Sequence, residues 1–177
     1  MDLWALDEVH FQQHGSRCRM WVAPEVRDPV CRHAPTRKSI SYFGAVRIRD
    51  GRLVTSKPEG RFDAQTCWTF LRKLRRKSRR TGRRVIVIID NARYHHANLH
   101  AEWRRRQEPN FVLLFLPPYS PQLNPIERVW KLLRKLWLHN RYFPTLDELI
   151  EIVDAQFSVW GRPNNALRRL CSISSHV

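Results

Sequence analysis

The chain has 177 residues, 42% of them apolar, which suits one domain with a buried core and excludes a mostly disordered chain. No apolar run approaches the ~18–20 residues that cross a bilayer, and the first residues lack a signal-peptide pattern. We therefore expect a cytoplasmic protein (nucleoid-associated in a bacterium) without a membrane partner. The 32 Lys and Arg against 16 Asp and Glu give a net charge of +16, which predicts nucleic acid as the polyanionic partner.

Apolar and β-branched segments predict the strands, and segments of helical period predict the helices. Strands come first and then alternate with helices, which indicates an α/β fold with a mixed sheet flanked by helices. The expected strands are residues 3–6, 19–23, 39–48, 52–55, 85–89 and 111–116. The expected helices are residues 63–78, 98–107, 125–139 and 146–160.

The cysteines form no C-x-x-C pair, so the sequence predicts neither a disulfide framework nor a zinc ribbon. An alternative zinc site would combine His14 and His33 with Cys18 and Cys31, but these spacings fit no common finger pattern. We expect reduced, partly buried thiols. The four cysteines are Cys18, Cys31, Cys67 and Cys171.

Two aspartates stand where apolar strands are expected to end, which is where ligand sites of open α/β sheets gather. Asp7 and Asp90, together with Glu127, offer oxygen ligands of the kind that Mg²⁺ prefers. Such a set suits two ions ~3.5–4 Å apart that assist phosphodiester displacement. Structural interpretations stay open, since Asp7 also suits a surface carboxylate and Asp90 before Asn91 suits an Asx-type turn.

Glu127 has a structural interpretation of its own. Asn124, Pro125 and Glu127 match the N-cap, first position and third position of a helix with a capping box, and Lys131 follows one turn later. Glu127 also lies at the edge of an expected apolar arc, with Lys131 and Arg134 on the same flank, which favours a position beside the sheet. The arc comprises Ile126, Val129, Trp130, Leu133, Leu136 and Trp137.

Three segments together carry a family resemblance: L-W-A-L-D-E-V-H-F (3–11), V-I-V-I-I-D-N-A-R-Y-H-H (85–96) and F-L-P-P-Y-S-P-Q-L-N-P-I-E-R-V-W-K (115–131). They resemble the DDE catalytic domain of the mariner-like transposase superfamily, in its bacterial insertion-sequence branch. S-Y-F-G-A-V (41–46) resembles a further region of that family. The similarity covers nearly the whole chain, and the P-P-Y-S-P-x-L-N-P-I-E block is highly specific.

The resemblance implies a ribonuclease H-like fold with a mixed five-stranded sheet, and Asp7, Asp90 and Glu127 as ligands of two Mg²⁺ ions, which Mn²⁺ can replace. It also implies cleavage of transposon-end DNA by water, followed by attack of a 3′-hydroxyl on target DNA. Family members commonly insert at TA dinucleotides and act as homodimers.

Neighbouring residues are expected in supporting roles. Asn91 and His95 either orient Asp90 and touch the scissile phosphate, or His95 and His96 cap the next helix or face solvent. Asn124 is expected to shape the helix start before Glu127. Glu8 alternates to the strand face opposite Asp7, so we do not expect it to be a ligand.

A dense run of basic residues between 71 and 84 favours a track for the DNA backbone, with a solvated helix face as the alternative. We expect Lys131 and Arg134 to extend the track. The basic residues chosen in the run are Arg72, Lys73, Arg75, Arg76, Arg79 and Arg80.

Only six residues precede Asp7, where family members carry a helix-turn-helix module. We therefore expect residues 1–177 to form a single catalytic domain without that module, which a separate polypeptide would then supply. Two other functions stay open: a catalytically incomplete remnant that only binds DNA, and a ribonuclease H-like nuclease without strand transfer. A zinc hydrolase built on His95, His96 and His100 is less favoured because their spacing suits no zinc site.

Overall fold

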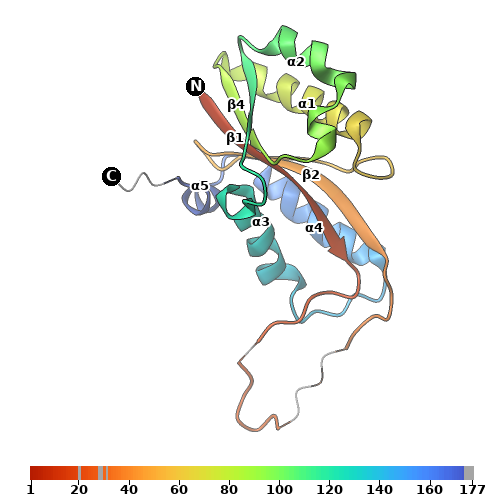
Figure 1. Cartoon of the computed structure of the whole chain (residues 1–177). Coiled ribbons are helices and arrows are strands. Elements are labelled where there is room, and N and C mark those ends of the chain that lie inside the picture. The colour runs from red at the N-terminus through yellow and green to blue at the C-terminus, as the bar shows by residue number, and fades with distance from the viewer. Residues whose placement is uncertain (20, 28–29, 31, 174–177) are drawn as a thin grey trace.

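The computed structural model describes residues 1–19, 21–27, 30 and 32–173. Its strands are β1 (Asp2–Gln12), β2 (Ser39–Arg47), β3 (Leu53–Ser56), β4 (Val85–Ile89) and β5 (Phe111–Phe115). They form one mixed sheet in the order β3-β2-β1-β4-β5 (Figure 1). β1 pairs antiparallel with β2 and parallel with β4, and β5 continues the parallel half. The predicted α/β class and mixed five-stranded sheet are confirmed.

Helices cover both faces of the sheet. They are α1 (Ala64–Ser78), α2 (Ala101–Gln107), α3 (Ile126–Leu133), α4 (Leu146–Trp160) and α5 (Asn165–Leu170). α1 and α2 lie on one face, and α3, α4 and α5 lie on the other (Figure 1). Among the described residues, no helix combines the length and the apolar character needed to cross a bilayer.

The central strand β1 supplies alternate side chains to two hydrophobic cores. Trp4 and Leu6 pack on the α1 side, whereas Ala5 and Val9 pack on the α3 and α4 side. The period of two along a strand therefore places neighbouring residues on opposite faces. Asp7 shares its face with α3, and Glu8 shares its face with α1.

β1 is longer than predicted, and the expected strand at residues 19–23 is wrong. The described residues of that segment have no strand partner and lie in solvent, with Trp21 fully exposed. β-branched and aromatic residues favour a strand only where a sheet face buries them. Instead, Ser16 forms an isolated bridge with His139, and the Asn140 side chain binds the backbone of Cys18.

The expected helix 125–139 changes its winding halfway. α3 ends at Leu133, and residues Arg134–Leu138 form a π-helical turn. The wider turn rotates the side chains that follow, so Leu138 is buried while Leu136 and Trp137 are exposed. The prediction that Leu136 and Trp137 continue the buried arc is wrong.

Two smaller differences concern the other helices. The helix expected at 98–107 is a 3₁₀ turn, Asn98–His100, followed by the short α2. α5 was not predicted, because its six residues are too few to show a helical period; Asn164 caps its start by accepting from the backbone N–H of Leu167. Asp63 caps α1 as expected, accepting from the backbone N–H of Thr66.

Candidate active site

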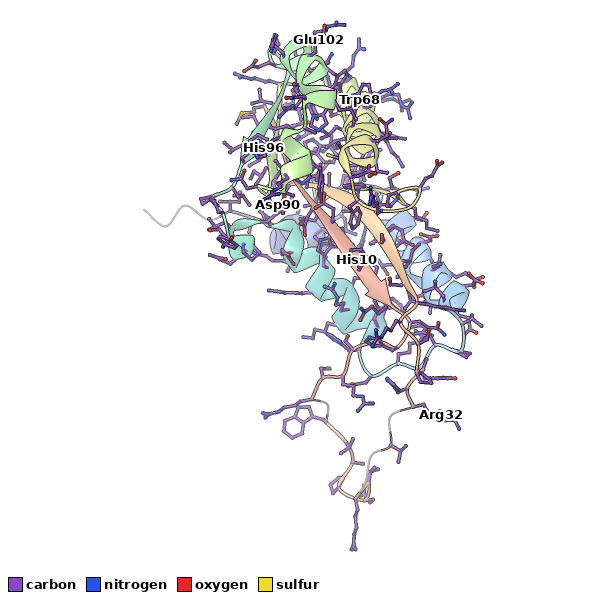
Figure 2. All side chains as sticks on the ribbon, turned by 45° about the vertical axis from the view of Figure 1, so that its right-hand side comes forward. His10, Arg32, Trp68, Asp90, His96 and Glu102 are labelled. Atoms are coloured by element: carbon purple, nitrogen blue, oxygen red, sulfur yellow. The ribbon has the colours of Figure 1, made fainter. Side chains whose placement is uncertain are left out.

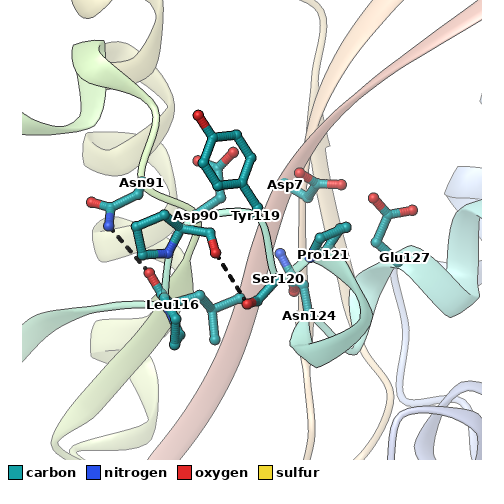
Figure 3. Close-up of a pocket in the computed structure, with 11 residues that line it drawn as sticks. Asp7, Asp90, Asn91, Leu116, Tyr119, Ser120, Pro121, Asn124 and Glu127 are labelled. Atoms are coloured by element: carbon teal, nitrogen blue, oxygen red, sulfur yellow. Dashed lines mark hydrogen bonds between the residues drawn. The ribbon is translucent and has the colours of Figure 1, made fainter.

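A cavity of about 480 Å³ opens between the end of β4, the middle of β1 and the start of α3 (Figure 3). Asp7, Asp90 and Glu127 all line it. β4 ends immediately before Asp90, as expected, whereas β1 continues past Asp7 to Gln12. The structure thus brings together three carboxylates, the first and last of which, Asp7 and Glu127, are 120 positions apart in the sequence.

Asp7 is the most strongly perturbed of the three. Burial raises its pKa to about 8, and the nearby carboxylates of Glu8 and Glu127 add to the increase. The indole Nε1–H of Trp130 donates to Asp7 Oδ2 at 3.0 Å, which acts in the opposite direction. A buried carboxylate beside two others favours a cation, because a cation offsets both the desolvation and the repulsion.

Asp90 is held from two sides. Its Oδ1 accepts from the backbone N–H of Ala92 at 3.1 Å, which is the Asx-type turn considered from the sequence. The same oxygen lies 2.9 Å from Nε2 of His95. The His95 contact lowers the Asp90 pKa, so this half-exposed side chain is an anion at neutral pH. The turn and a place in the cavity are compatible, since the turn uses only one oxygen.

The expected capping box at Glu127 does not form. Within the described chain, no side chain caps the start of α3, and the Asn124 amide reaches away to donate to the Leu6 carbonyl at 2.8 Å. This hydrogen bond links the residues just before α3 to β1, one residue before Asp7. It therefore fixes the position of the start of α3 relative to β1. The Glu127 carboxylate lies beside Asp7 at the cavity wall (Figure 3).

His95 is completely buried, on the α1 side of the sheet. Its Nε2 lies 2.9 Å from Asp90 Oδ1 and 3.4 Å from Glu8 Oε1, and its Nδ1 contacts Cys67 Sγ at 3.3 Å. Burial alone would lower the His95 pKa, but the contacts with Asp90, Cys67 and Glu8 outweigh it and raise the pKa to about 11. The ring is thus an imidazolium that links two carboxylates.

Among the described residues, one group of three potential metal ligands has all its donor atoms within 4.8 Å, and it is Glu8, Asp90 and His95. Because the His95 ring is an imidazolium, its nitrogens carry protons and offer no lone pair to a metal, and its charge offsets one of the two carboxylate charges. Asp7 and Glu127 line the cavity with carboxylate oxygens, and the half-buried Arg134 is the cation whose charge acts on both, so the chemistry of the donor set fits metal ions at the cavity and not at the buried group.

Asn91 also lines the cavity. Its Nδ2 donates to the Leu116 carbonyl at 3.3 Å (Figure 3), and its Oδ1 accepts from His96 Nε2 at 2.6 Å. His96 stacks on Phe115 at 4.1 Å between ring centroids. Asn91 is therefore a link between the end of β4 and the end of β5, and its side chain forms no hydrogen bond with Asp90 within the described part of the chain.

The rim of the cavity is the stiff segment of prolines after β5. Tyr119 stands at its tip with a fully exposed ring and a positive φ of 56°. Few residues other than glycine adopt this backbone region, and such strain tends to occur at functional sites. Asp90 lies beneath this rim, at the junction of the α1 and α2 layer with α3 (Figure 2; Figure 3).

The basic run on α1 and the 3₁₀ turn after it, Arg79–Thr81, divides into two sets. Lys73 donates to the Thr55 carbonyl at 2.7 Å, and Arg75 donates to the Gln107 side chain at 3.0 Å, so both hold neighbouring elements. Arg134 is half-buried over the Phe11 ring, and Lys131 is exposed. Of the six basic residues chosen in the run, the exposed ones are Arg72, Arg76, Arg79 and Arg80.

The zinc alternative at the β1–β2 connection includes Cys31, which lies outside the described residues. Cys18 is exposed there, and the rings of His14 and His33 are 6.1 Å apart. The expectation of partly buried thiols holds for the buried Cys67 and Cys171 but not for Cys18. Figure 2 shows that the connection, which includes Arg32, projects away from the sheet.

Two neighbours of the acids were missed from the sequence. Glu8 was set aside because it faces away from Asp7, yet it contacts His95 and thereby bears on Asp90. Trp130 lies on the expected apolar arc, which does not predict that its N–H donates to Asp7. A sequence signal existed for Trp130, since it lies three residues after Glu127 and shares its side of the helix.

Comparisons with known proteins agree with this geometry. Residues 2–150 match the family model described as DDE superfamily endonuclease. An uncharacterised protein, y4pE/y4sA of Sinorhizobium fredii, is 38% identical over 69 residues, which are 39% of this chain and 47% of that protein. An uncharacterised 39 kDa protein of insertion element IS630 from Shigella sonnei is 24% identical over 112 residues, 63% of this chain and 32% of its own length.

Solved structures show the same fold. The Mos1 mariner paired end complexes with Mn and with Mg each superpose with a TM-score of 0.66 over 96% of this chain. Sequence identities are 21% and 20%, and the matched parts are 51% and 53% of those chains. The chain thus spans about half or less of the length of its curated relatives and of the Mos1 chains.

Proposed function

Because the chain belongs to the DDE superfamily of endonucleases and has the ribonuclease H-like fold of DDE transposase catalytic domains, we propose that it cuts phosphodiester bonds at transposon ends. In a second step it would join the 3′-hydroxyl ends to target DNA. The observation that carries this proposal is the meeting of Asp7, Asp90 and Glu127 at one cavity.

The three carboxylates are proposed to hold two Mg²⁺ ions, with Mn²⁺ as a substitute. When bound, the pair supplies activation of the attacking oxygen and charge neutralisation at the leaving oxygen of an in-line displacement. The Asn124 amide fixes α3 against β1 and so sets where Glu127 stands relative to Asp7. His95 and the Ala92 backbone hold one oxygen of Asp90, which leaves the other free for the cavity.

DNA is the proposed partner. The net charge of +16 and the exposed arginines of α1 and of the turn after it supply phosphate contacts, and the likeness to Mos1 complexes with a transposon end supports the same partner here. We further propose that the active form is a homodimer and that a helix-turn-helix polypeptide supplies recognition of the ends. Light scattering of the chain with and without end DNA tests the dimer.

The decisive experiment measures nicking and joining of a supercoiled plasmid with Mg²⁺, Mn²⁺ or EDTA. Asp90→Asn and Glu127→Gln should abolish both reactions while DNA affinity changes little, and the exposed Glu151→Gln on α4 serves as the matched control. Cutting that persists in Asp90→Asn would reject the site.

The same assay separates the other candidate functions. DNA binding without cutting by the natural chain, in either metal, would identify an incomplete remnant. Cutting whose products never join target DNA would identify a nuclease without strand transfer.

A further inference from the structure

Trp130 and Asp7 are joined across two elements of the fold. The indole Nε1–H donates to Asp7 Oδ2 at 3.0 Å, and the Trp130 side chain is almost fully buried. The N–H of indole is a donor only, so it can hold one oxygen of a carboxylate and cannot itself bind a cation. The second oxygen of Asp7 is left for the cavity.

The backbone of β2 makes room for this contact. Gly44 lies opposite Asp7 in the β1–β2 register. A Cβ at position 44 would lie 2.7 Å from Cζ2 of Trp130, closer still to its Cη2, and 3.4 Å from Cδ1 of Ile126. Any residue larger than glycine would therefore push the indole away from β1.

Helical spacing links this contact to the third carboxylate. Trp130 follows Glu127 by three residues on α3, so both side chains project from the same side of the helix. The same turn of α3 therefore places Glu127 at the cavity and packs the Trp130 indole against Gly44, within hydrogen-bond distance of Asp7. The Trp130 ring is fixed from behind by an edge-on contact with Phe157 of α4, 6.0 Å between centroids.

From this geometry we propose that Trp130 is a positioning residue for the metal site, and that Gly44 exists to admit its ring. Trp130 sets the orientation of the Asp7 carboxylate and its separation from Glu127. The inference rests on the proposed function in one respect, namely that Asp7 binds metal. It predicts that losing a single N–H donor, with no loss of charge, weakens metal binding.

The test compares Trp130→Phe with Trp160→Phe, a matched loss from another buried tryptophan of the same core that does not contact Asp7. Mn²⁺ affinity is measured by electron paramagnetic resonance on the full chain without DNA, and melting temperature is measured on the same samples. Trp130→Phe should bind Mn²⁺ about 10- to 100-fold more weakly, the range for lost partners of metal ligands. Trp160→Phe should bind it as the natural chain does.

Gly44→Ala provides a second variant, because it keeps the indole but displaces it. It should weaken Mn²⁺ binding in the same direction as Trp130→Phe. A ¹⁵N spectrum of the indole groups adds a metal-free readout: the Trp130 signal, identified by its absence in Trp130→Phe, should move in Asp7→Asn and stay in place in Glu151→Gln.

The outcomes separate this inference from the proposed function. Equal Mn²⁺ affinity of Trp130→Phe and Trp160→Phe would overturn it even if the chain cuts DNA. Mn²⁺ binding that depends on Trp130 in a chain that never cuts DNA would reject the proposed function and uphold the positioning role. A natural chain that binds no Mn²⁺ would overturn both.

Discussion

His95 Nε2 lies 2.9 Å from Oδ1 of Asp90, although one side chain is completely buried and the other is half-exposed at the cavity. The two residues are five positions apart, and the short 3₁₀ turn Arg93–His96 folds the histidine back beneath the end of β4. Glu8, on the α1 face of β1, lies 3.4 Å from the same nitrogen. Asp90 is thus oriented by a cation that the protein itself supplies, on the side away from the cavity.

Replacing His95 with Gln should lower cleavage and Mg²⁺ affinity by about 10- to 100-fold, because the Asp90 carboxylate loses its charged partner. The measurement is the Mg²⁺ dependence of plasmid nicking. His33→Gln, which removes an exposed histidine, controls for general effects. If both variants need the same Mg²⁺ concentration as the natural chain, His95 does not position Asp90.

Replacing Asp7 with Asn should stabilise the metal-free protein at pH 9. Burial and the neighbouring Glu8 and Glu127 raise the Asp7 pKa from 3.8 to about 8. Since the folded-state pKa lies above the unfolded one, this group's stabilisation is complete below about 3.8 and is lost as the pH rises through 8. Asn carries no charge to bury, so it avoids that loss.

Bound Mg²⁺ should instead make the natural chain more stable than Asp7→Asn. Mg²⁺ at about 100 times its dissociation constant stabilises a protein by about 2.7 kcal/mol, provided that it binds only the folded state. Melting curves at pH 9, with EDTA and with Mg²⁺, should show the gain in the natural chain and none in Asp7→Asn. An equal gain in both would place the ions elsewhere, and the exposed Asp147→Asn is the control.

The fold was predictable where local pattern and tertiary environment agree. The β-branched run of β4 and the capped, amphipathic α1 appear as expected. Residues 19–23 have strand composition, but those of them that the structure describes have no partner strand, and their exposure depends on neighbours that no local pattern encodes. The π turn after Leu133 likewise depends on packing, because Leu138 must reach the core beside α4.

For the site, the sequence placed Asp7, Asp90 and Glu127 together only through motifs read as a set, and their metal binding stays a prediction. The contacts that support these carboxylates could not be predicted from the sequence, for a physical reason. Asn124 has the sequence of a helix cap, yet its amide binds Leu6 on a distant strand. A contact that spans more than a hundred residues leaves no spacing signal along the chain.

Loss of the Asp50 carboxylate should destabilise the chain at neutral pH and flatten its acid denaturation. Asp50 accepts two hydrogen bonds from Arg47, at 2.8 and 2.6 Å, and Arg47 is buried. Burial raises the Asp50 pKa, but the Arg47 contacts outweigh it, and the net pKa lies below its usual 3.8. This stabilisation is present above about 3.8 and is lost as the pH falls through the lower folded pKa.

Asp50→Asn should therefore cost about 2 kcal/mol at pH 7, in the range for hydrogen bonds to charged groups, and less at pH 2–3. Urea unfolding across this pH range measures the difference. If the free energies of unfolding of Asp50→Asn and the natural chain differed by the same amount at all pH values, the Arg47–Asp50 ion pair would not account for the loss of stability in acid.

The salt dependence of DNA binding should distinguish the two sets of basic residues on α1 and the 3₁₀ turn that follows it. Arg76→Ala and Arg80→Ala remove exposed charges, and each should reduce the slope of log affinity against log salt by about 1 if it contacts a phosphate. Lys73→Ala should leave the slope unchanged and lower the melting temperature, since Lys73 binds Thr55. Unchanged slopes for all three would assign the run to a solvated helix face.

Tyr119 should trade stability against DNA binding. Its φ of 56° costs a residue with a side chain on the order of 1 kcal/mol, and its fully exposed ring has little packing to lose. Tyr119→Gly should therefore raise the free energy of unfolding by up to about 1 kcal/mol, reduced somewhat by the greater freedom of glycine in the unfolded chain.

On the rim above Asp90, the ring is placed to stack on a base beside the scissile phosphate, a contact of about 1–3 kcal/mol. Tyr119→Phe keeps the ring and the strain, so it should bind end DNA as the natural chain does, whereas Tyr119→Gly should bind it at least fivefold more weakly, a ratio of about 1 kcal/mol. Fluorescence anisotropy measures the affinity of the three proteins for one duplex. Equal affinities would show that the Tyr119 ring does not contact DNA and that its backbone conformation matters only for the structure of the loop.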